Sequence, residues 1–181
     1  MQRKEAGLMR LLCGIIFSTM LIGCADTHEF LRGNGGGQVV LERNASAYIA
    51  VPRDGVYGGT VYHGSGQNTA QIILAAFPKH LLQVVTAPAY EDYKKSLELV
   101  KKEGYNYLIY PVILEWEDRA TEWSGIPDRV SVKITVVDAN TGRVADSAIV
   151  KGRSGWATFG GDHPQDLLPK PTGEYASSLF R

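Results

Sequence analysis

Cysteine is scarce in this sequence: Cys13 and Cys24 are the only two in 181 residues. Cys13 lies within an N-terminal segment that has the layout of a secretory signal, and Cys24 lies directly after it. If residues 1–23 are removed and Cys24 is modified, no thiol remains for a disulfide, a thiolate metal site or a nucleophile. The remaining 158 residues are enough for one domain stabilised by its hydrophobic core alone.

The sequence also lacks an excess of charge of either sign. The whole chain has 19 basic and 19 acidic residues, and residues 24–181 have 16 and 18, a formal charge of −2. No run of basic residues is present. Because nucleic-acid binding depends on clustered cations, the composition predicts no nucleic-acid partner.

Motifs for catalysis and cofactor binding are absent as well. The four histidines, His28, His63, His80 and His163, are scattered without the spacing of a zinc site. Asp162 precedes His163, but neighbouring side chains of a strand point to opposite faces, and no G-x-S-x-G motif accompanies them. The glycines of 58–66 match neither G-x-G-x-x-G nor a P-loop. We therefore predict no catalytic residues, no metal and no cofactor.

The longest apolar run, Leu11–Gly23, is too short to span a membrane, which takes roughly 20 apolar residues. It follows a basic segment containing Arg3, Lys4 and Arg10, as in a secretory signal. The run ends in Leu21-Ile22-Gly23-Cys24, which resembles the lipobox of bacterial lipoproteins.

The lipobox resemblance implies cleavage before Cys24, a diacylglycerol thioether on its sulfur and a further acyl chain such as palmitate on its amino group. Two or three acyl chains hold a protein on a membrane far more durably than one. Ala25 stands where enterobacterial sorting would place Asp to retain a lipoprotein in the inner membrane. We therefore expect an outer-membrane protein facing the periplasm, although Asp26 leaves the inner membrane as an alternative.

Residues 24–38 are predicted to form a lipidated, flexible tether, because they include Gly33 and Gly35–Gly37. Residues 39–181 are predicted to form a single periplasmic α/β domain with a mixed sheet, helices mainly on one face and the order β-α-β-α-β-β-β-α. Apolar periodicity and turn residues place its strands at 47–51, 81–86, 105–116, 129–138 and 144–153, and its helices from Ser65 to Phe77, at 91–103 and near 175–180.

Three boundaries carry specific expectations. Pro88 is expected to close the second strand, and Ser65 is expected to cap the first helix. Pro111 lies inside the third strand and implies an edge or a bulge there. Residues 56–66 are expected to be irregular, and Trp156–Gly161 is expected to form a core strand and turn.

Trp, Arg and carboxylate side chains are densest around the loop between the third and fourth strands. Exposed Trp together with Arg is typical of recognition sites, so Trp116, Arg119, Trp123 and Asp128 are the candidate surface for a partner or ligand. The alternative is that the tryptophans pack on the core and the charges are solvated. A calcium site is disfavoured, because calcium-loop spacing is absent.

Two segments, Lys102–Pro111 and Val137–Gly142, resemble parts of the curli-secretion lipoprotein's periplasmic domain and of the Tol propeller protein's N-terminal domain. A closer resemblance is to the lipoprotein family called domain of unknown function 4823. It is carried by Ala47–Ala50, Trp116–Arg119 with Trp123–Gly125, and Pro164–Leu168 with Tyr175 and Leu179–Phe180. The family has no known activity, so the resemblance implies no catalytic residues.

The sequence therefore predicts a non-enzymatic, membrane-tethered module that binds an envelope protein or self-associates. One alternative is a binding protein or small enzyme for periplasmic small molecules or glycans, which would need a deep pocket near 116–128 or 58–66. Another is a structural envelope lipoprotein without a specific ligand.

Overall fold

The computed structural model describes residues 26–33, 40–118, 127–155 and 163–180. The elements in chain order are β1 (Thr27–Arg32), β2 (Ser46–Val51), β3 (Val56–Tyr57), β4 (Thr60–Val61), α2 (Ser65–Ala76), β5 (Gln83–Tyr90), α3 (Tyr93–Glu103), β6 (Tyr107–Glu117), β7 (Arg129–Asp138), β8 (Val144–Arg153), a short 3₁₀ helix (Pro164–Leu167) and α4 (Pro169–Ser178). Trp156–Gly161, Arg119 and Trp123 lie outside the described residues.

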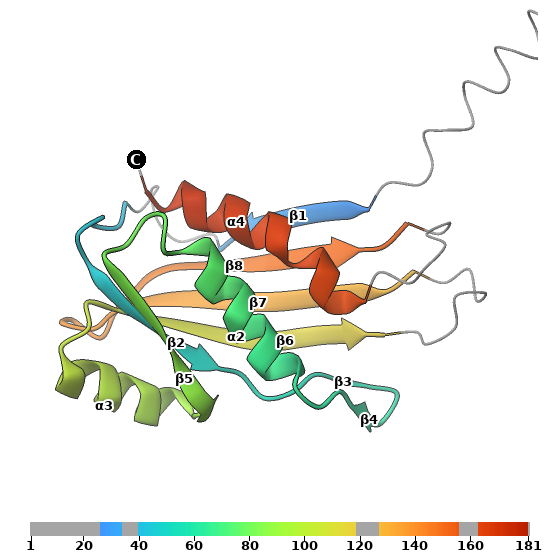
Figure 1. Ribbon diagram of the computed structural model, residues 1–181, viewed down its shortest axis with the longest axis horizontal. Helices are drawn as coiled ribbons and strands as arrows, with labels where there is room; N and C mark the ends of the chain where they lie inside the picture. The colour runs from blue at the N-terminus through green and yellow to red at the C-terminus, as the bar shows by residue number, and fades with distance from the viewer. Residues whose placement is uncertain (1–25, 34–39, 119–126, 156–162, 181) are drawn as a thin grey trace, which may run out of the picture.

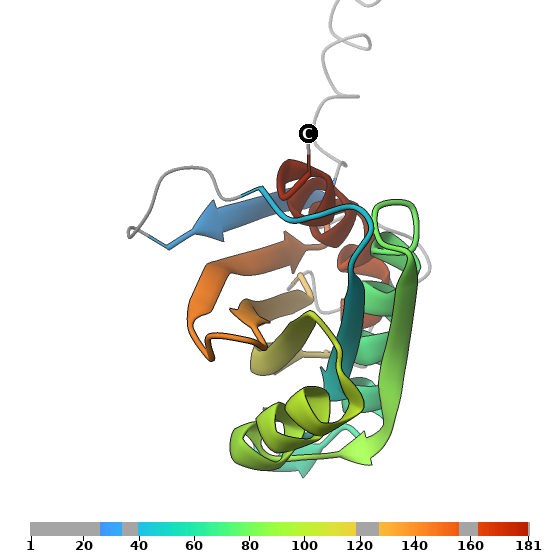
Figure 2. The same cartoon turned by 90° about the vertical axis from the view of Figure 1, so that its left-hand side faces the viewer.

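Six strands form one mixed sheet in the order β1-β8-β7-β6-β2-β5 (Figure 1). β2 pairs in parallel with β5 and β6, and the pairs on the β6 side are antiparallel. Helices α2 and α4 cover one face, and α3 packs on the other face near β2 and β6 (Figure 2). The predicted α/β class and element order are confirmed, with β1 and the small β3–β4 hairpin as additions.

The prediction that residues 24–38 form a flexible tether is wrong for Thr27–Arg32. These residues form β1, which pairs antiparallel with β8 along its whole length. Exposure alternates along β1, so Phe30 and Arg32 turn toward α4 while Glu29 and Leu31 turn outward. The nearby glycines favoured coil locally, but backbone pairing with a strand more than 100 residues away determines the structure here.

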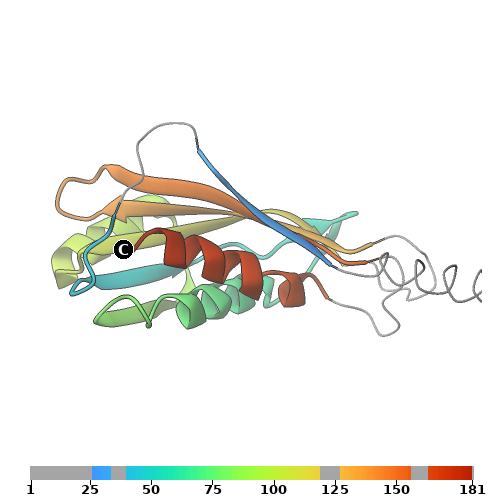
Figure 3. The same cartoon turned by 90° about the horizontal axis from the view of Figure 1, so that it is seen from above.

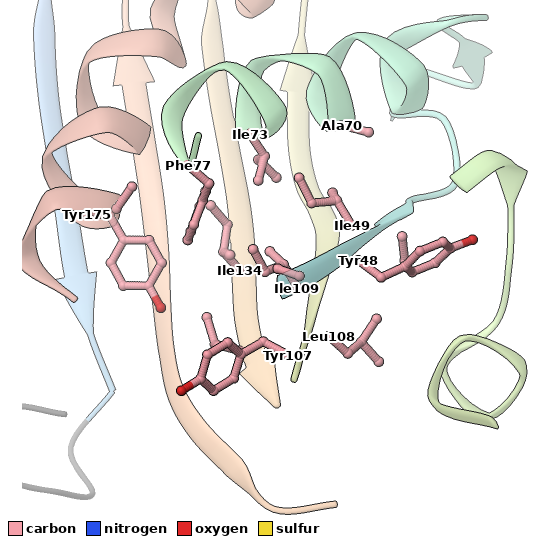
Figure 4. Close-up of a cluster of buried hydrophobic side chains, with 14 of the residues drawn as sticks. Tyr48, Ile49, Ala70, Ile73, Phe77, Tyr107, Leu108, Ile109, Ile134 and Tyr175 are labelled. Carbon is pink, nitrogen blue, oxygen red and sulfur yellow. The ribbon is translucent and has the colours of Figure 1, made fainter. Parts of the chain in front are cut away.

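The core lies between the sheet and α2. Ala70, Ile73 and Phe77 fall on one face of α2 at the predicted helical spacing, and all are at most 1% exposed. Figure 4 shows Ile49, Ile109 and Ile134 of three adjacent strands directed toward that face. Burying each of these aliphatic side chains contributes about 1.5–3 kcal/mol before the entropic cost of ordering it.

Helix α3 has the ends that the sequence predicts within two residues. The Asp92 side chain accepts a hydrogen bond from the Lys95 backbone N–H at 2.9 Å, and Gly104 ends the helix at a φ of 78°. Helix α2 differs from the expectation, because Gly64 occupies the cap position in place of Ser65. Helix α4 begins at Pro169, six residues before the predicted start.

The prolines lie where the sheet tolerates a missing N–H. Pro111 lies on β6 just beyond Ile109, the last residue that pairs with β2, and a bulge follows between Ile113 and Glu115. The prediction of an edge or bulge in this strand is therefore confirmed. Pro88 does not close the preceding strand, because β5 is an outer strand of the sheet and continues to Tyr90 through a register shift.

Strands β7 and β8 have the predicted bounds, and they pair as an antiparallel hairpin of two long strands that extend together along the sheet (Figure 3). Its turn is ordered by Asp138, whose carboxylate accepts hydrogen bonds from the Thr141 backbone N–H at 2.8 Å and the Thr141 hydroxyl at 3.1 Å. The backbone N–H of Thr141 holds the pKa of Asp138 below its usual value.

Candidate functional site

The structure brings together two regions that the sequence offered as separate candidates. The Tyr62 hydroxyl, next to β4, donates a hydrogen bond of 2.9 Å to the Asp118 backbone carbonyl, after β6. Gly55 lies directly against Trp116, so that a Cβ placed on Gly55 would lie 2.5 Å from the Trp116 Cβ. The 52–66 segment therefore packs directly against the end of β6.

Trp116 does not contribute to an exposed surface. Only 2% of it is exposed, and it packs with the core at the end of β6. This corrects its assignment to a binding surface and fits the alternative, a strand-end Trp packed on the core. The bulge before Glu115 explains the orientation, because it turns Trp116 to the same face as its partner Val130.

Asp128 is 9% exposed, and its backbone is fastened to Ser154 after β8. Its N–H donates to the Ser154 hydroxyl at 2.9 Å, and its carbonyl accepts from the Ser154 N–H at 3.1 Å. These contacts join the start of β7 to the end of β8. The other two predicted surface residues, Arg119 and Trp123, fall outside the described residues.

A hollow of about 450 Å³ lies between residues 52–56, the end of β5 and the part of β6 beyond its pairing with β2. The Arg53 guanidinium lies 4.6 Å from the centre of the Tyr90 ring, in cation–π geometry. Burial raises the pKa of Tyr110 above its usual value. The lining combines aromatic and aliphatic side chains with the Arg53 guanidinium and the carboxylates of Asp54 and Glu115, a composition typical of a pocket for a small ligand.

Residues 52–55 pack against the N-terminus of α2. The Asp54 carboxylate accepts a hydrogen bond of 2.9 Å from the Gly66 N–H, and the Ser65 hydroxyl accepts one of 2.8 Å from the Gly55 N–H. A Cβ on Gly66 would meet the Pro52 carbonyl oxygen. Asp54 thus accepts from the Gly66 N–H, and the Tyr62 carbonyl accepts from the Ser65 N–H, so groups of the chain itself occupy these donors at the start of the helix.

Histidine contacts in the described residues do not form a metal centre. His63 lies 3.7 Å from Asp54, and His163 lies 3.5 Å from Asp118, in each case as a pair. Within residues 26–33, 40–118, 127–155 and 163–180, no group of three or more His, Cys, Asp or Glu side chains is placed to hold a metal ion.

Sequence reasoning missed an exposed surface on the sheet face opposite α2 and α4. Four side chains form a row across adjacent strands: Val112 of β6, Lys133 of β7, Ile149 of β8 and Leu31 of β1. Residues directly opposite in antiparallel strands share a face, so these four lie together. We call this row the open face. Leu31 and Val112 are 46% and 40% exposed, and no described helix covers them (Figure 2).

The open face could not be found from the sequence, because it depends on strand order and β1. The apolar alternation along β7 places Lys133 on the face opposite Val132 and Ile134, but nothing local to β7 indicates which strands lie beside it. Tyr93 of α3 contacts the ring of Tyr110 on β6, and the pairing of β6 with β2 ends at Ile109. Val112 lies farther along β6 than both of these contacts.

A family model for a domain of unknown function, DUF4823, matches residues 39–179. The chain belongs to this family. As a member of the DUF4823 family, it has no activity assigned through its family. No curated protein matches the chain.

Solved structures add support for the fold of this DUF4823 chain. The PelC dodecamer from Paraburkholderia phytofirmans has a TM-score of 0.64 and 18% identity, covering 87% of this chain and 99% of that one. Protein XCC0632 from Xanthomonas campestris has a TM-score of 0.47 and 13% identity, covering 80% and 86% of the two chains. Lipoprotein GNA1162 from Neisseria meningitidis has a TM-score of 0.41 and 16% identity, covering 62% and 82%. Because the other two TM-scores are below 0.5, only the PelC similarity bears on the fold.

No helix in the described part of this DUF4823 chain is long and apolar enough to cross a membrane.

Proposed function

We propose that this protein is a non-enzymatic lipoprotein that is anchored in the outer membrane through Cys24, faces the periplasm and acts as an assembly module. In this proposal its partner is another envelope protein, in the first place a second copy of the same chain. The observation that carries the proposal is the open face, an ordered sheet surface that exposes Leu31 and Val112 to solvent.

The open face has the composition of a contact surface. Exposed aliphatic side chains on an otherwise well-packed sheet gain from being removed from water, and Lys133 and the neighbouring Lys151 and Glu29 supply polar contacts around them. A second copy as partner is supported by the structural likeness to a protein whose solved form is a dodecamer.

The anchor is supported by the sequence around Cys24, with Leu21-Ile22-Gly23 preceding it. Mass spectrometry of the protein purified from membranes tests it directly. We expect the mature chain to begin at acylated Cys24 and globomycin to block its processing. An unmodified Cys24 would contradict the anchor, and recovery from inner-membrane fractions alone would contradict the outer-membrane assignment.

In-cell photocross-linking tests the assembly role with Cys24 left intact. A photoreactive amino acid at Leu31 or Val112 should give a dimer or a defined adduct with one envelope protein. The matched control is Leu82, which is 79% exposed but lies outside the open face. Equal adduct formation at Leu82 and Val112, or none at either, would contradict the proposal.

The hollow beside Arg53 supports a second candidate function, the binding of a small periplasmic molecule. Native mass spectrometry of protein released gently from envelopes would detect a bound molecule as a defined mass increment. The Arg53→Ala variant should lose that increment if the hollow is the site. A wild-type protein without any increment would contradict this candidate.

A further inference from the structure

Asp26–Arg32, the described residues that follow Cys24 most closely in the chain, are part of the fold. Asp26 is the first described residue, and its carboxylate accepts a hydrogen bond of 2.9 Å from the Gly155 backbone N–H, just after β8. Thr27 then pairs with Arg153, and the pairing continues to Arg32 opposite Ala148. The chain therefore enters the sheet at Thr27, three residues after the predicted lipid-bearing cysteine.

The docking of β1 is supported on both sides of the strand. Arg32 lies 3.1 Å from the Asp146 carboxylate and donates a hydrogen bond of 2.7 Å to the Ser178 hydroxyl of α4. The rings of Phe30 and Tyr175 lie 5.9 Å apart. On the outward side, Glu29 lies 3.5 Å from Lys151. These contacts hold β1 to β8 and α4 through side chains as well as through the backbone ladder.

We propose that β1 fixes the orientation of the whole domain on the bilayer. Two Cα steps separate Cys24 from Asp26, a reach of about 7–8 Å. The sheet end where β1 and β7 begin and β6 and β8 end is therefore held at the lipid headgroups (Figure 1). This inference rests on the proposed acylation of Cys24.

The sheet end beside Asp26 has the chemistry of a headgroup contact. A hollow of about 360 Å³ lies there, lined by the cations Arg129, Lys151 and Arg153 and the carboxylates Glu29 and Glu115. Groups of both signs match the phosphate and ammonium groups of zwitterionic phospholipids. With its charges, this end contacts the headgroup layer without entering the acyl chains.

The orientation determines what the open face meets. Its four residues lie four positions along β1 and β8 from the pair Thr27–Arg153, about 13 Å at the rise of a strand. With the strands directed away from the bilayer, the open face points sideways, parallel to the membrane. Its partner is then a protein anchored in the same leaflet, such as a second copy of this chain.

Quenching by lipid-borne nitroxides tests the orientation. Because the mature chain has no free thiol once Cys24 is acylated, a single introduced cysteine can carry a fluorophore. Arg153→Cys and Arg143→Cys form a matched pair, since both are exposed arginines that lie at or just beyond opposite ends of β8. These positions are ten residues apart, about 33 Å along a strand.

In the acylated full-length protein in phosphatidylethanolamine-containing nanodiscs, we expect headgroup nitroxides to quench the label at position 153 at least threefold more than the label at 143. A nitroxide deep in the acyl chains should quench neither label. Insertion of twenty Gly/Ser residues between Ala25 and Asp26 adds a flexible span of about 25 Å, and the difference between the two positions should then disappear.

The outcomes separate this inference from the proposed function. Acylated protein with equal headgroup quenching at 143 and 153 overturns the fixed orientation and leaves the anchor standing. Strong quenching from the acyl-chain depth at 153 overturns the headgroup contact. Protein that is not acylated at Cys24 overturns the anchor, and this inference with it.

Discussion

At the scale of single residues, the close approach of Gly55 to Trp116 determines how the 52–66 segment lies on the sheet. A side chain on Gly55 would occupy the space of the Trp116 Cβ, and Gly66 is similarly closed in by the Pro52 carbonyl. The indole is consequently buried, and the loop that contains Arg53 and Asp54 is held beside β6.

Gly55→Ala should lower the free energy of unfolding by about 1–3 kcal/mol, because the added methyl overlaps Trp116. Gly173→Ala is the control, since the space around Gly173 is open and the residue lies within α4. It should raise the free energy of unfolding by about 0.5–1 kcal/mol. Urea denaturation measures both, and equal effects of the same sign would contradict the packing.

His80 illustrates how burial makes stability depend on pH. Its ring stacks on Phe180 with 4.8 Å between ring centres, and burial, with Arg43 and Lys79 nearby, lowers its pKa below 6.5. Between that lowered value and 6.5 the unfolded chain binds more protons than the folded one. The contribution of His80 to the free energy of unfolding is therefore fully present above pH 6.5, and it is lost as the pH falls toward the pKa of His80 in the folded protein.

The melting temperature of the wild-type protein should thus fall as the pH decreases below about 6.5. His80→Phe preserves a ring against Phe180 and should reduce this dependence, which thermal unfolding monitored by circular dichroism at several pH values would measure. His63→Phe is the control, because the His63 side chain is 89% exposed. An unchanged pH slope in His80→Phe would contradict the assignment.

At the scale of elements, some strands and helices form because of residues close together in the chain, whereas others form because they pair with segments far away in the chain. Helix α3 and the β7–β8 hairpin follow directly from capping residues, periodicity and turn residues. Strand β1 does not, because its glycine-rich surroundings favour coil and its partners, β8 and α4, are more than 100 residues away. β5 extends beyond Pro88 for a related reason: its position at an edge could not be known from its own residues.

Two ion pairs between β1 and β8 provide a test of how β1 is held. Asp146→Ala removes the carboxylate that pairs with Arg32, and this carboxylate is only 9% exposed. We expect the free energy of unfolding to fall by about 2 kcal/mol, less than the roughly 3–5 kcal/mol lost when a fully buried pair is broken. Lys151→Ala breaks the exposed ion pair with Glu29 and should lower the free energy of unfolding by less than about 1 kcal/mol.

Hydrogen exchange measured by mass spectrometry gives the local readout for these two variants. Amide protection of Thr27–Arg32 should decrease in Asp146→Ala and remain close to wild type in Lys151→Ala. Greater loss of protection in Lys151→Ala would contradict the view that the inner face of β1 holds the strand.

At the scale of the whole molecule, the sheet is covered unevenly. Helices α2 and α4 cover one face, whereas α3 covers only the region near β2 and β6 on the other (Figure 2). The open face remains on the outside, and the predicted position of the anchor places it sideways to the membrane. Uneven cover of this kind is the structural observation that supports the proposed assembly role.

Val112→Lys combined with Ile149→Lys should weaken self-association, because the added charges would have to be buried in a contact between copies. Analytical ultracentrifugation of the acylated protein in detergent should show at least a tenfold increase in the dissociation constant. Leu82→Lys, far from the open face, should leave it unchanged. A monomeric wild-type protein would contradict self-association.

The sequence by itself determined the α/β class, the boundaries of α3 and the β7–β8 hairpin, an edge or a bulge in β6 near Pro111, and the prediction of a lipid anchor at Cys24. These features depend on residues close together in the chain, where capping, periodicity and turn preferences act. Only the tertiary structure decided that Trp116 is buried, that residues 27–32 are a strand and that Leu31, Val112, Lys133 and Ile149 share a surface. Each of these depends on which segments distant in the chain pair with one another, and the preferences that act between neighbouring residues do not specify those partners.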